Sequence, residues 1–323
     1  MLRHAQPAVK PRMARAWDAG ERAVASIVAM GDEAARRGRR WRRALQRSLA
    51  APPRALRGID RSLPVVVICQ WRRAEVVDRL LADLAGQRDV RCTLVLWCNN
   101  PLAAPALRRA IARMPAGAVV DVRLVRSRWN LGGLARFVVA RHLADAGHAA
   151  PFLTIDDDMR LGSGVVATLV AAAAPHRYAG HWAWAPVADD YHERRLVADG
   201  EPAGYVGTGG AVLDPTLADD AFFAMLPNRY AAVEDLWASI VARHRGWDVR
   251  RVALEVEYVD DGRDQYRALP TRKAELWRDR ARLVEQHETD LDGDVGLESV
   301  RLREAIAWAR AAVPRALSRL ARR

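Results

Sequence analysis

Three consecutive aspartates follow a short apolar run in the stretch FLTIDDDMRL at residues 152–161. Their charges repel one another unless a cation, an arginine or water separates them. Hard divalent cations such as Mg²⁺ and Mn²⁺ take oxygen ligands, and beside substrate phosphates they need only one or two protein carboxylates. Side chains alternate along a strand, so we expect Asp156 and Asp158 to face one way and Asp157 the other. That pair could hold a metal-bound diphosphate, whereas the alternative is a helix N-cap or a solvated turn.

A second acidic pair, Glu234 and Asp235, lies near the start of a segment with helical spacing of apolar residues at 231–247. Carboxylates in the first turn of a helix are stabilised by the helix dipole, and that structural role alone would explain the pair. The other interpretation is general-base chemistry, for which a positioned carboxylate is suited. Taken alone, the pair favours the structural role, so the surrounding motifs have to decide.

The segments that must position these residues alternate between two patterns. Short apolar runs predict strands, and helical spacing predicts the helices between them. The strands are expected at 63–71, 90–100, 118–127 and 151–158, and the helices at 74–86, 104–114 and 132–147. This order predicts a parallel sheet built from right-handed crossovers, in which ligands gather at the carboxyl ends of the strands. The sequence places polar residues at those ends, namely Gln70, then Asn99 and Asn100, then Ser127 to Asn130, then the three aspartates.

The second half of the chain is less regular. We expect a helix at 164–174, a strand at 177–187, a strand and turn at 204–218, the helix at 231–247 and a strand at 248–261. Trp182 and Trp184 would share one face of their strand, where they could stack on a sugar or pack in the core. We divide the chain into a basic helical N-terminal extension at 1–62, an α/β domain at 63–270 and a C-terminal helical segment at 271–323.

The formal charge of +12 is unevenly distributed along the chain. Residues 1–63 hold 15 Lys and Arg against 5 Asp and Glu, whereas the remainder holds 36 against 34. Only Lys10 and Lys273 are lysines, so nearly every cation is an arginine. Because the excess is confined to the N-terminal arm and the sequence has no zinc-finger, RNP or helix-turn-helix spacing, we do not expect a nucleic-acid partner. The arm is either a solvated helix or a peripheral contact with anionic lipid.

Three cysteines without CxxC spacing indicate neither a disulfide framework nor a zinc site, which favours a reducing compartment. The longest apolar run, at 164–174, is about half of the roughly 20 residues that span a bilayer. The N-terminus lacks the pattern of a signal peptide. We therefore expect a cytoplasmic protein that could also lie peripherally at the inner face of the membrane.

Six motifs occur in a fixed order between about residues 64 and 260: VVVICQW, LVLWCNN, RSRWNLGGLARF, LTIDDDMRL, GYVGTGGAVL and VEDLWASIVARHRGW. In this order they resemble the GT-A glycosyltransferases, in particular the inverting family-two enzymes and their galactofuranosyltransferase relatives. The resemblance implies the GT-A, or nucleotide-diphospho-sugar transferase, fold, with a mostly parallel central sheet flanked by helices. It also implies transfer of a sugar from a nucleoside diphosphate sugar, a UDP-sugar, to a hydroxyl of a glycan, glycolipid or small acceptor, with Mn²⁺ or Mg²⁺ as cofactor.

The resemblance assigns roles to individual residues. The donor nucleotide would contact Gln70, Asn99 or Asn100, Asn130, Gly132 and Gly133, although the family usually has an aspartate where the asparagine pair stands. Arg136 would contact a phosphate or the sugar of the donor. Asp156 and Asp158 would hold the metal and the donor, and Asp157 would touch the sugar. Gly209 and Gly210 would form the floor under donor and acceptor. Asp235 would be the general base that deprotonates the acceptor hydroxyl, and Glu234 would support it.

The sequence departs from this family at one expected metal ligand. Many relatives have a histidine downstream of the acidic pair, but VEYVDDGRDQYRAL contains none, so Asp260, Asp261 or Asp264 would replace it or fewer protein ligands would hold the ion. The DDD stretch and the late acidic pair are also similar to the retaining exostosin-like GT-A branch, which predicts the opposite anomeric outcome. Two further alternatives are a catalytically inactive module that binds a sugar nucleotide or glycan, and a nucleotidyltransferase, although CQWRRAEVVD lacks the glycine usual in the latter.

Overall fold

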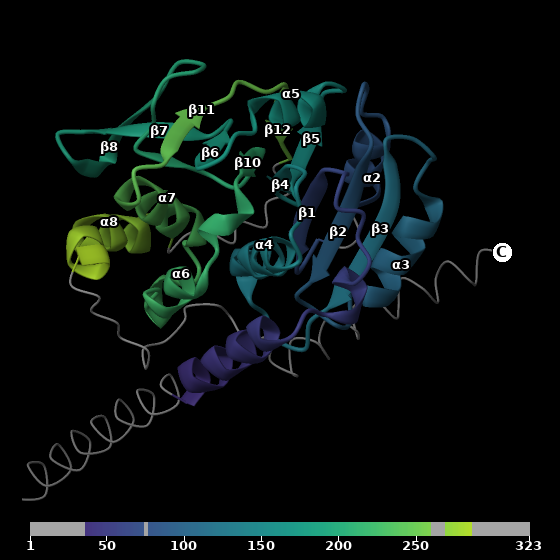
Figure 1. Cartoon of the computed structure of the whole chain (residues 1–323), viewed down its shortest axis with the longest axis horizontal. Coiled ribbons are helices and arrows are strands. Elements are labelled where there is room, and N and C mark those ends of the chain that lie inside the picture. The colour runs from purple at the N-terminus through teal and green to yellow at the C-terminus, as the bar shows by residue number, and fades with distance from the viewer. Residues whose placement is uncertain (1–35, 74–76, 260–268, 286–323) are drawn as a thin grey trace, which may run out of the picture.

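The computed structural model describes residues 36–73, 77–259 and 269–285. Within these residues a central sheet has the strand order β11-β6-β10-β4-β1-β2-β3 (Figure 1). All of its strand pairings are parallel except those of β10, which runs antiparallel to both β4 and β6. The strands are β1 (Val65–Gln70), β2 (Cys92–Cys98), β3 (Val119–Arg126), β4 (Phe152–Ile155), β6 (Arg177–Gly180), β10 (Ala211–Leu213) and β11 (Asp248–Arg251). The expected α/β fold with a mostly parallel central sheet is confirmed.

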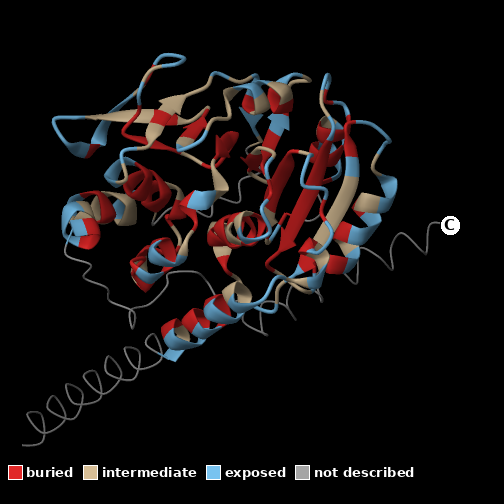
Figure 2. Ribbon diagram, viewed as in Figure 1, coloured by how far each residue is buried: buried red, intermediate tan, exposed pale blue. Residues whose placement is uncertain are grey.

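Helices cover both faces of this sheet (Figure 2). Successive residues of β1 alternate between the two layers: Val65 and Val67 pack with one hydrophobic cluster, and Val66 and Ile68 with the other. One cluster includes residues of α4 (Ala135–Asp145) and α7 (Glu234–His244), and the other includes residues of α2 (Val77–Ala85), α3 (Ala104–Arg113) and α5 (Val165–Ala172). A strand buried on both faces has a continuous apolar sequence, which explains the runs in β1 and β2.

Two expected strands are each divided between different sheets, so their predicted extents were wrong. The segment 177–187 forms β6 and then β7 (Ala183–Val187), which pairs with β8 (Asp190–Leu196) and β9 (Tyr205–Val206) in a separate sheet. The segment 248–261 forms β11 and then β12 (Val256–Tyr258), which pairs antiparallel with β5 (Met159–Leu161). Apolar spacing within a segment cannot indicate this change of partner, because both halves have extended backbone.

A helix at residues 36–50 packs against the body of the molecule. Trp41 and Leu45 are buried in the main hydrophobic cluster, and the indole N–H of Trp41 donates to the carbonyl of Asn130 at 3.1 Å. Its solvent face is basic, with Arg36, Arg39, Arg40, Arg43 and Arg47 all exposed. A contact between this face and anionic lipid stays a prediction, as does the division of the chain at residues 62 and 270.

Arg42 extends from the same helix into the protein interior. Its guanidinium donates to Asn228 Oδ1 at 2.8 Å, to the carbonyl of Phe223 at 3.0 Å and to that of Leu226 at 2.5 Å. Burial lowers the pKa of Arg42 to about 10, which leaves the group charged at neutral pH. The side chain therefore anchors the helix at 36–50 to residues 223–228, which precede α7.

Arg42→Ala is expected to lower the free energy of unfolding by about 2–4 kcal/mol, because three buried oxygens lose their donor. Urea titration of the full chain would measure this change. Arg43→Ala is the matched control, since Arg43 is the exposed neighbour on the same helix and should change stability by less than about 0.5 kcal/mol. Equal effects of the two substitutions would contradict the anchoring role.

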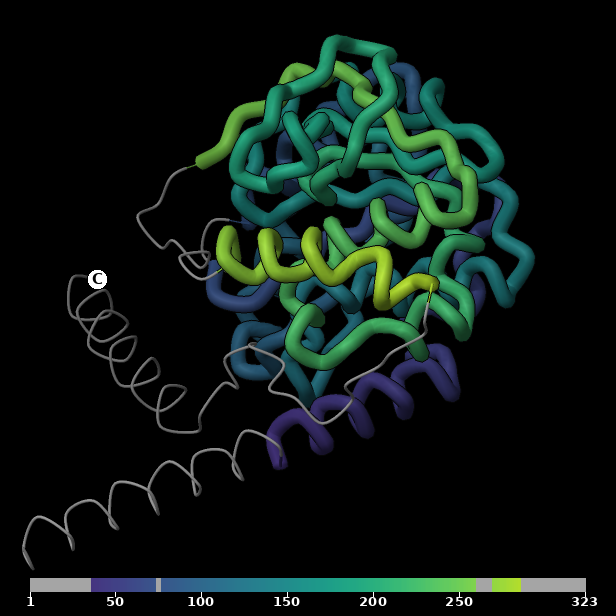
Figure 3. The backbone as a smooth tube through the Cα atoms, turned by 90° about the vertical axis from the view of Figure 1, so that its left-hand side faces the viewer, coloured from purple at the N-terminus to yellow at the C-terminus, as the bar shows by residue number. Residues whose placement is uncertain are grey.

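The C-terminal helix α8 (Leu269–Glu285) crosses the face that Figure 3 turns toward the viewer. It agrees with the helix expected at the start of the C-terminal segment, and it packs against α7 and β8. The rest of the expected C-terminal helical segment, at 286–323, lies outside the described residues. None of the helices in the described ranges is both long and apolar enough to cross a bilayer.

Candidate active site

The polar residues expected at the strand ends do lie at one edge of the central sheet. Gln70 ends β1, Asn99 follows β2 and Asp156 follows β4, and β1 lies between the other two strands. The Gln70 side chain is fully buried, and neither its amide oxygen nor its amide nitrogen has a hydrogen-bond partner among the described residues. An unpaired buried amide is costly, so Gln70 suits a ligand that offers one donor and one acceptor.

Asn99 holds the loop that contains the NLGG motif. Its Nδ2 donates to the carbonyl of Gly132 at 3.0 Å, and its Oδ1 accepts from the N–H of Leu131 at 3.0 Å. Asn130 closes the same loop, because its Oδ1 accepts from the N–H of Gly132 at 2.8 Å. Asn100 instead accepts from the N–H of Leu102 at 3.1 Å within its own turn. Asn99 and Asn130 therefore shape the backbone of the NLGG loop, whereas Asn100 does not contact it.

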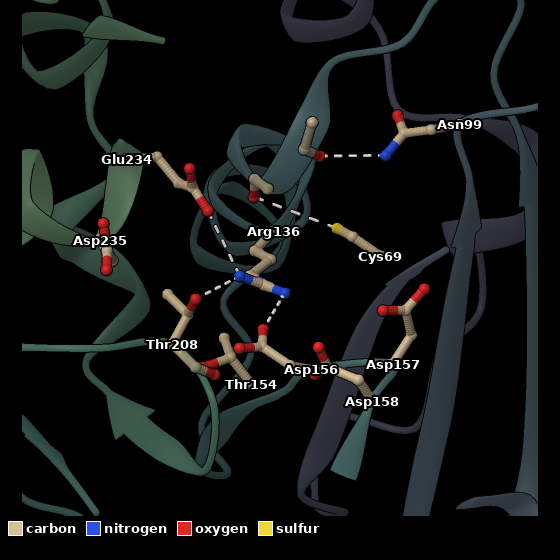
Figure 4. A network of polar contacts seen from close by, with 12 residues as sticks. Cys69, Asn99, Arg136, Thr154, Asp156, Asp157, Asp158, Thr208, Glu234 and Asp235 are labelled. Atoms are coloured by element: carbon tan, nitrogen blue, oxygen red, sulfur yellow. Dashed lines mark hydrogen bonds and ion pairs between the residues drawn. The ribbon is translucent and has the colours of Figure 1, made fainter. Parts of the chain in front are cut away.

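Arg136 joins the two acidic motifs (Figure 4). This residue of α4 is buried, and its Nη2 lies 2.5 Å from Asp156 Oδ1. Its Nη1 lies 3.3 Å from Glu234 Oε1 and also donates to the hydroxyl of Thr208. One guanidinium thus connects the end of β4 with the first turn of α7. Both acidic motifs were predicted to belong to the site, whereas Arg136 was predicted only as a contact with the donor.

Two of the predicted glycines lie against the carboxylates of this network. A Cβ atom on Gly133 would come within 1.6 Å of Glu234 Oε1, and one on Gly209 would come within 2.7 Å of Asp156 Oδ2. These are closer than any real side-chain contact, so a larger residue would displace each carboxylate from Arg136. Gly210 has a positive φ of 74°, which favours glycine for a different reason.

Gly133→Ala is expected to lower the free energy of unfolding by about 1–3 kcal/mol, because Glu234 must move away from Arg136. Thermal or urea unfolding would measure the loss. Gly164→Ala provides the control, since a Cβ there meets no atom within 4 Å and the residue precedes helix α5. A Gly133→Ala protein as stable as the control would show that the close approach has no energetic consequence.

The three aspartates do not follow the alternation of a continuous strand. Strand β4 ends at Ile155, so Asp157 and Asp158 lie in the turn that leads to β5. Asp157 Oδ1 and Asp158 Oδ2 both contact Arg73 Nη1, at 3.2 and 2.8 Å, whereas Asp156 contacts Arg136. The expectation that Asp156 and Asp158 share one face by strand geometry was therefore wrong, because the turn reorients the chain.

Lys273 of α8 contacts the second member of the late acidic pair. Its Nζ lies 2.5 Å from Asp235 Oδ2, and the N–H of Leu236 donates to Asp235 Oδ1 at 2.8 Å. Lys273 and Arg73 were not predicted from the sequence as parts of the site. The only signal for Lys273 was its rarity, as one of two lysines among 51 basic residues. For Arg73, one of many arginines, the sequence offered only its position just after β1.

The site has more acidic groups than basic ones. In the described part of the chain, its ion pairs join five carboxylates to three cations. Burial raises the pKa of Asp157 to about 7 and that of Glu234 to about 7, although Arg73 and Arg136 act in the opposite direction. Burial also raises the pKa of Asp158. Protons or an added cation would reduce the repulsion among these carboxylates.

The DDD stretch supplies carboxylate oxygens of the kind that a divalent cation prefers. Asp158 Oδ1 is buried and has no hydrogen-bond partner among the described residues, and the surrounding charge is negative. The same residues contain no group of three or more His, Cys, Asp or Glu side chains arranged to hold a metal. Asp260, Asp261 and Asp264 lie outside the described residues. Asp156 and Asp158 thus fit a cation that takes most of its ligands from another molecule, for example from the oxygens of a diphosphate.

The two tryptophans are placed differently, contrary to the expectation that they share a face. Trp182 lies between β6 and β7 and stacks on Tyr258 with ring centroids 5.0 Å apart. The Tyr258 hydroxyl in turn lies close to Gly209, and the Trp182 Nε1 atom is buried without a partner among the described residues. Trp184 lies in β7, where Arg194 stacks over its ring at 5.2 Å. Trp182 lies near Asp235 as well, since a Cβ on Gly207 would meet atoms of both residues.

No protein-family model matches the sequence, and no curated protein matches it. Among solved structures, TarS from S. aureus is 11% identical over 69% of this chain and 42% of its own, with a TM-score of 0.42. The mannosyltransferase PcManGT from Pyrobaculum calidifontis, in complex with GDP-Man and Mn²⁺, is 16% identical over 81% of this chain and 72% of its own, with a TM-score of 0.42. Residues 1–349 of TarS, in complex with UDP, are 13% identical over 59% of this chain and 58% of their own length, with a TM-score of 0.40. The chain thus spans less than two thirds of either TarS chain, and likenesses this distant establish no family.

Proposed function

We propose that the protein is a metal-dependent glycosyltransferase of the GT-A type, which moves a sugar from a UDP-sugar to a hydroxyl acceptor with inversion. The observation that carries the proposal is the bridge through Arg136, which connects Asp156 to Glu234 across the end of the sheet. Because of this bridge, the DDD stretch and the late acidic pair share one site with the polar ends of β1 and β2. An acidic anchor for a diphosphate beside a candidate base suits glycosyl transfer.

The nucleotide of the donor is proposed to bind at the ends of β1 and β2. Gln70 offers a buried amide donor and acceptor, which complements the N–H and carbonyl edge of a uracil ring. The loop shaped by Asn99 and Asn130 would lie along the ribose and diphosphate, where Gly132 brings the backbone close. Substituting Gln70 would therefore weaken nucleotide binding without removing a side-chain hydrogen bond to any described residue.

The metal is proposed to be Mn²⁺ or Mg²⁺, held by Asp156 and Asp158 together with the diphosphate oxygens. When bound, such an ion neutralises the negative charge that develops on the departing diphosphate. Arg136 and Arg73 already contact the two carboxylates and would keep them in place before the donor arrives. Asp157, paired with Arg73, would lie beside the sugar.

Asp235 is proposed as the general base. It takes the proton from the acceptor hydroxyl as that oxygen bonds to the anomeric carbon, while the bond from carbon to the diphosphate breaks and the diphosphate leaves with the electron pair. Glu234 precedes Asp235 and is fixed by Arg136, so it supports the position of the first turn of α7. Trp182 and Tyr258 provide an aromatic surface on which the acceptor could stack.

A panel of nucleotide sugars tests the proposal. UDP-glucose, UDP-galactose, UDP-N-acetylglucosamine and GDP-mannose would each be incubated with the full chain and Mn²⁺, and release of UDP or GDP would be measured. Turnover that requires metal and is lost with EDTA supports the proposal. A thermal shift with UDP and Mn²⁺ but no turnover of any donor would favour the inactive binding module, and a shift with short duplex DNA alone would overturn the proposal.

The anomeric configuration of the product separates the inverting mechanism from the retaining one. The coupling constant of the anomeric proton, followed by NMR during turnover, reports the configuration directly. Inversion is expected, since a carboxylate held in position at the start of α7 can act as a base on the acceptor. A product with the configuration of the donor would instead favour the exostosin-like branch.

A further inference from the structure

The C-terminal helix α8 brings one ammonium group to the proposed base. Lys273 Nζ lies 2.5 Å from Asp235 Oδ2, and the two side chains are only 18% and 13% exposed. The other oxygen of Asp235 accepts from the N–H of Leu236 at 2.8 Å. Each carboxylate oxygen thus has its own donor, so the orientation of the whole group is fixed by α7 on one side and α8 on the other.

The docking of α8 does not depend on this ion pair. Farther along the helix, the indole N–H of Trp277 donates to the carbonyl of Asp189 at 3.0 Å, and Arg280 Nη2 lies 2.6 Å from Asp189 Oδ1. Asp279 accepts from the hydroxyl of Tyr230 at 2.5 Å. The buried side chains Leu276, Trp277, Leu283 and Val284 add an apolar contact. Because these contacts hold the helix, Lys273 is available for a role other than packing.

A lysine at this position is unusual for this chain. Two of its 51 basic residues are lysines, and the other is Lys10, outside the described residues. An ammonium is compact and acts as a point charge, whereas a guanidinium is planar and needs more space. Burial lowers the pKa of Lys273, but the charges of Asp235, Tyr191 and Glu234 and the hydrogen bond to Asp235 together raise the pKa above its ordinary value. The group therefore stays charged in a site with excess carboxylates.

We propose that Lys273 is a positioning residue for Asp235, which holds the carboxylate in the orientation from which it accepts the proton of the acceptor hydroxyl. This inference rests on the proposed function and extends it to a residue beyond the α/β domain that the sequence predicted. The helix α8 is then part of the active site. Donor binding should not depend on Lys273, because the proposed donor contacts lie at the ends of β1, β2 and β4.

Lys273→Ala tests the inference in the full chain, with the donor that gives the highest turnover in the nucleotide-sugar panel. We expect kcat to fall by about 10- to 100-fold, the scale of effect for a misplaced catalytic group. The Kd of UDP in the presence of Mn²⁺ should stay within about twofold of the wild-type value, since the ammonium contacts Asp235 and not the donor site. Arg278→Ala is the control, because it removes an exposed cation from the same helix.

Chemical rescue separates positioning from a merely structural role. Ethylammonium added to Lys273→Ala should restore part of kcat, because the small amine can occupy the space of the lost group, whereas ethanol should not. Lys273→Arg should recover less than the amine does, since the guanidinium does not fit the same space. A kcat within twofold of wild type in Lys273→Ala would overturn the inference, and so would a loss that no amine restores. A wild-type protein without turnover would overturn the proposed function itself.

Discussion

Asp235→Asn is expected to abolish sugar transfer while leaving donor binding intact. Asparagine keeps the shape of the side chain and can still accept from the N–H of Leu236, but it cannot take a proton from an acceptor hydroxyl. Loss of a general base typically lowers the rate by about 10²- to 10⁴-fold. The expected result is a kcat reduced on that scale, with the Kd of UDP and Mn²⁺ close to the wild-type value.

Steady-state kinetics and calorimetric titration of UDP would provide the two measurements. Asp220→Asn is the matched control, because Asp220 is a carboxylate whose side chain is 92% exposed and which lies in another short helix, α6 (Asp220–Ala224). It should leave kcat and Kd unchanged. If Asp235→Asn transferred sugar at the wild-type rate, the base would have to be another group, and Glu234, whose pKa is raised to about 7 by burial, would be tested next by Glu234→Gln.

Much of the fold could be predicted, because the sequences of its central strands indicate that these strands are buried. Strands such as β1 and β2 are covered on both faces, so their sequences are continuous apolar runs that identify a parallel sheet. The β7 and β8 hairpin and the pairing of β12 with β5 could not be predicted in the same way. Strand β8 is largely exposed, with the sequence DYHERRL, and its partner is determined by tertiary packing rather than by its own pattern.

The acidic residues of the site could be identified from the sequence, but their partners could not. Asp156 and Glu234 could be proposed because of the order of the motifs around them, since each acidic stretch alone also fits a structural role. Arg73 and Lys273 do not stand out, because an ion pair between distant positions leaves no periodic signal, and the pair of Arg73 with Asp158 spans 85 residues. Because the chain has many arginines, the residue type alone does not distinguish Arg73 from arginines on the surface. Contacts of this kind depend on how the helices and turns meet, which the sequence pattern does not encode locally.

Arg136→Met is expected to have the largest effect on stability in the site. Methionine preserves the apolar stem but removes the guanidinium that contacts Asp156, Glu234 and Thr208. Two carboxylates then remain in a buried site without their cation, and breaking a buried pair in this way typically costs about 3–5 kcal/mol. Urea unfolding should show a loss of that size, and UDP binding with Mn²⁺ should weaken as well, because Asp156 is no longer held in place.

A double-mutant cycle identifies the cause of that loss. Glu234→Gln added to Arg136→Met should recover part of the lost stability, because it removes one of the two uncompensated charges. Arg141→Met on the same helix is the control: its side chain is 22% exposed and pairs with Asp145 and Asp220, so it should cost at most about 1 kcal/mol. If Arg136→Met were no more destabilising than Arg141→Met, then Arg136 would not be the group that holds the two acidic motifs together. Recovery in the double mutant would instead show that charge compensation by Arg136 is what allows carboxylates from β4 and α7 to occupy one buried site.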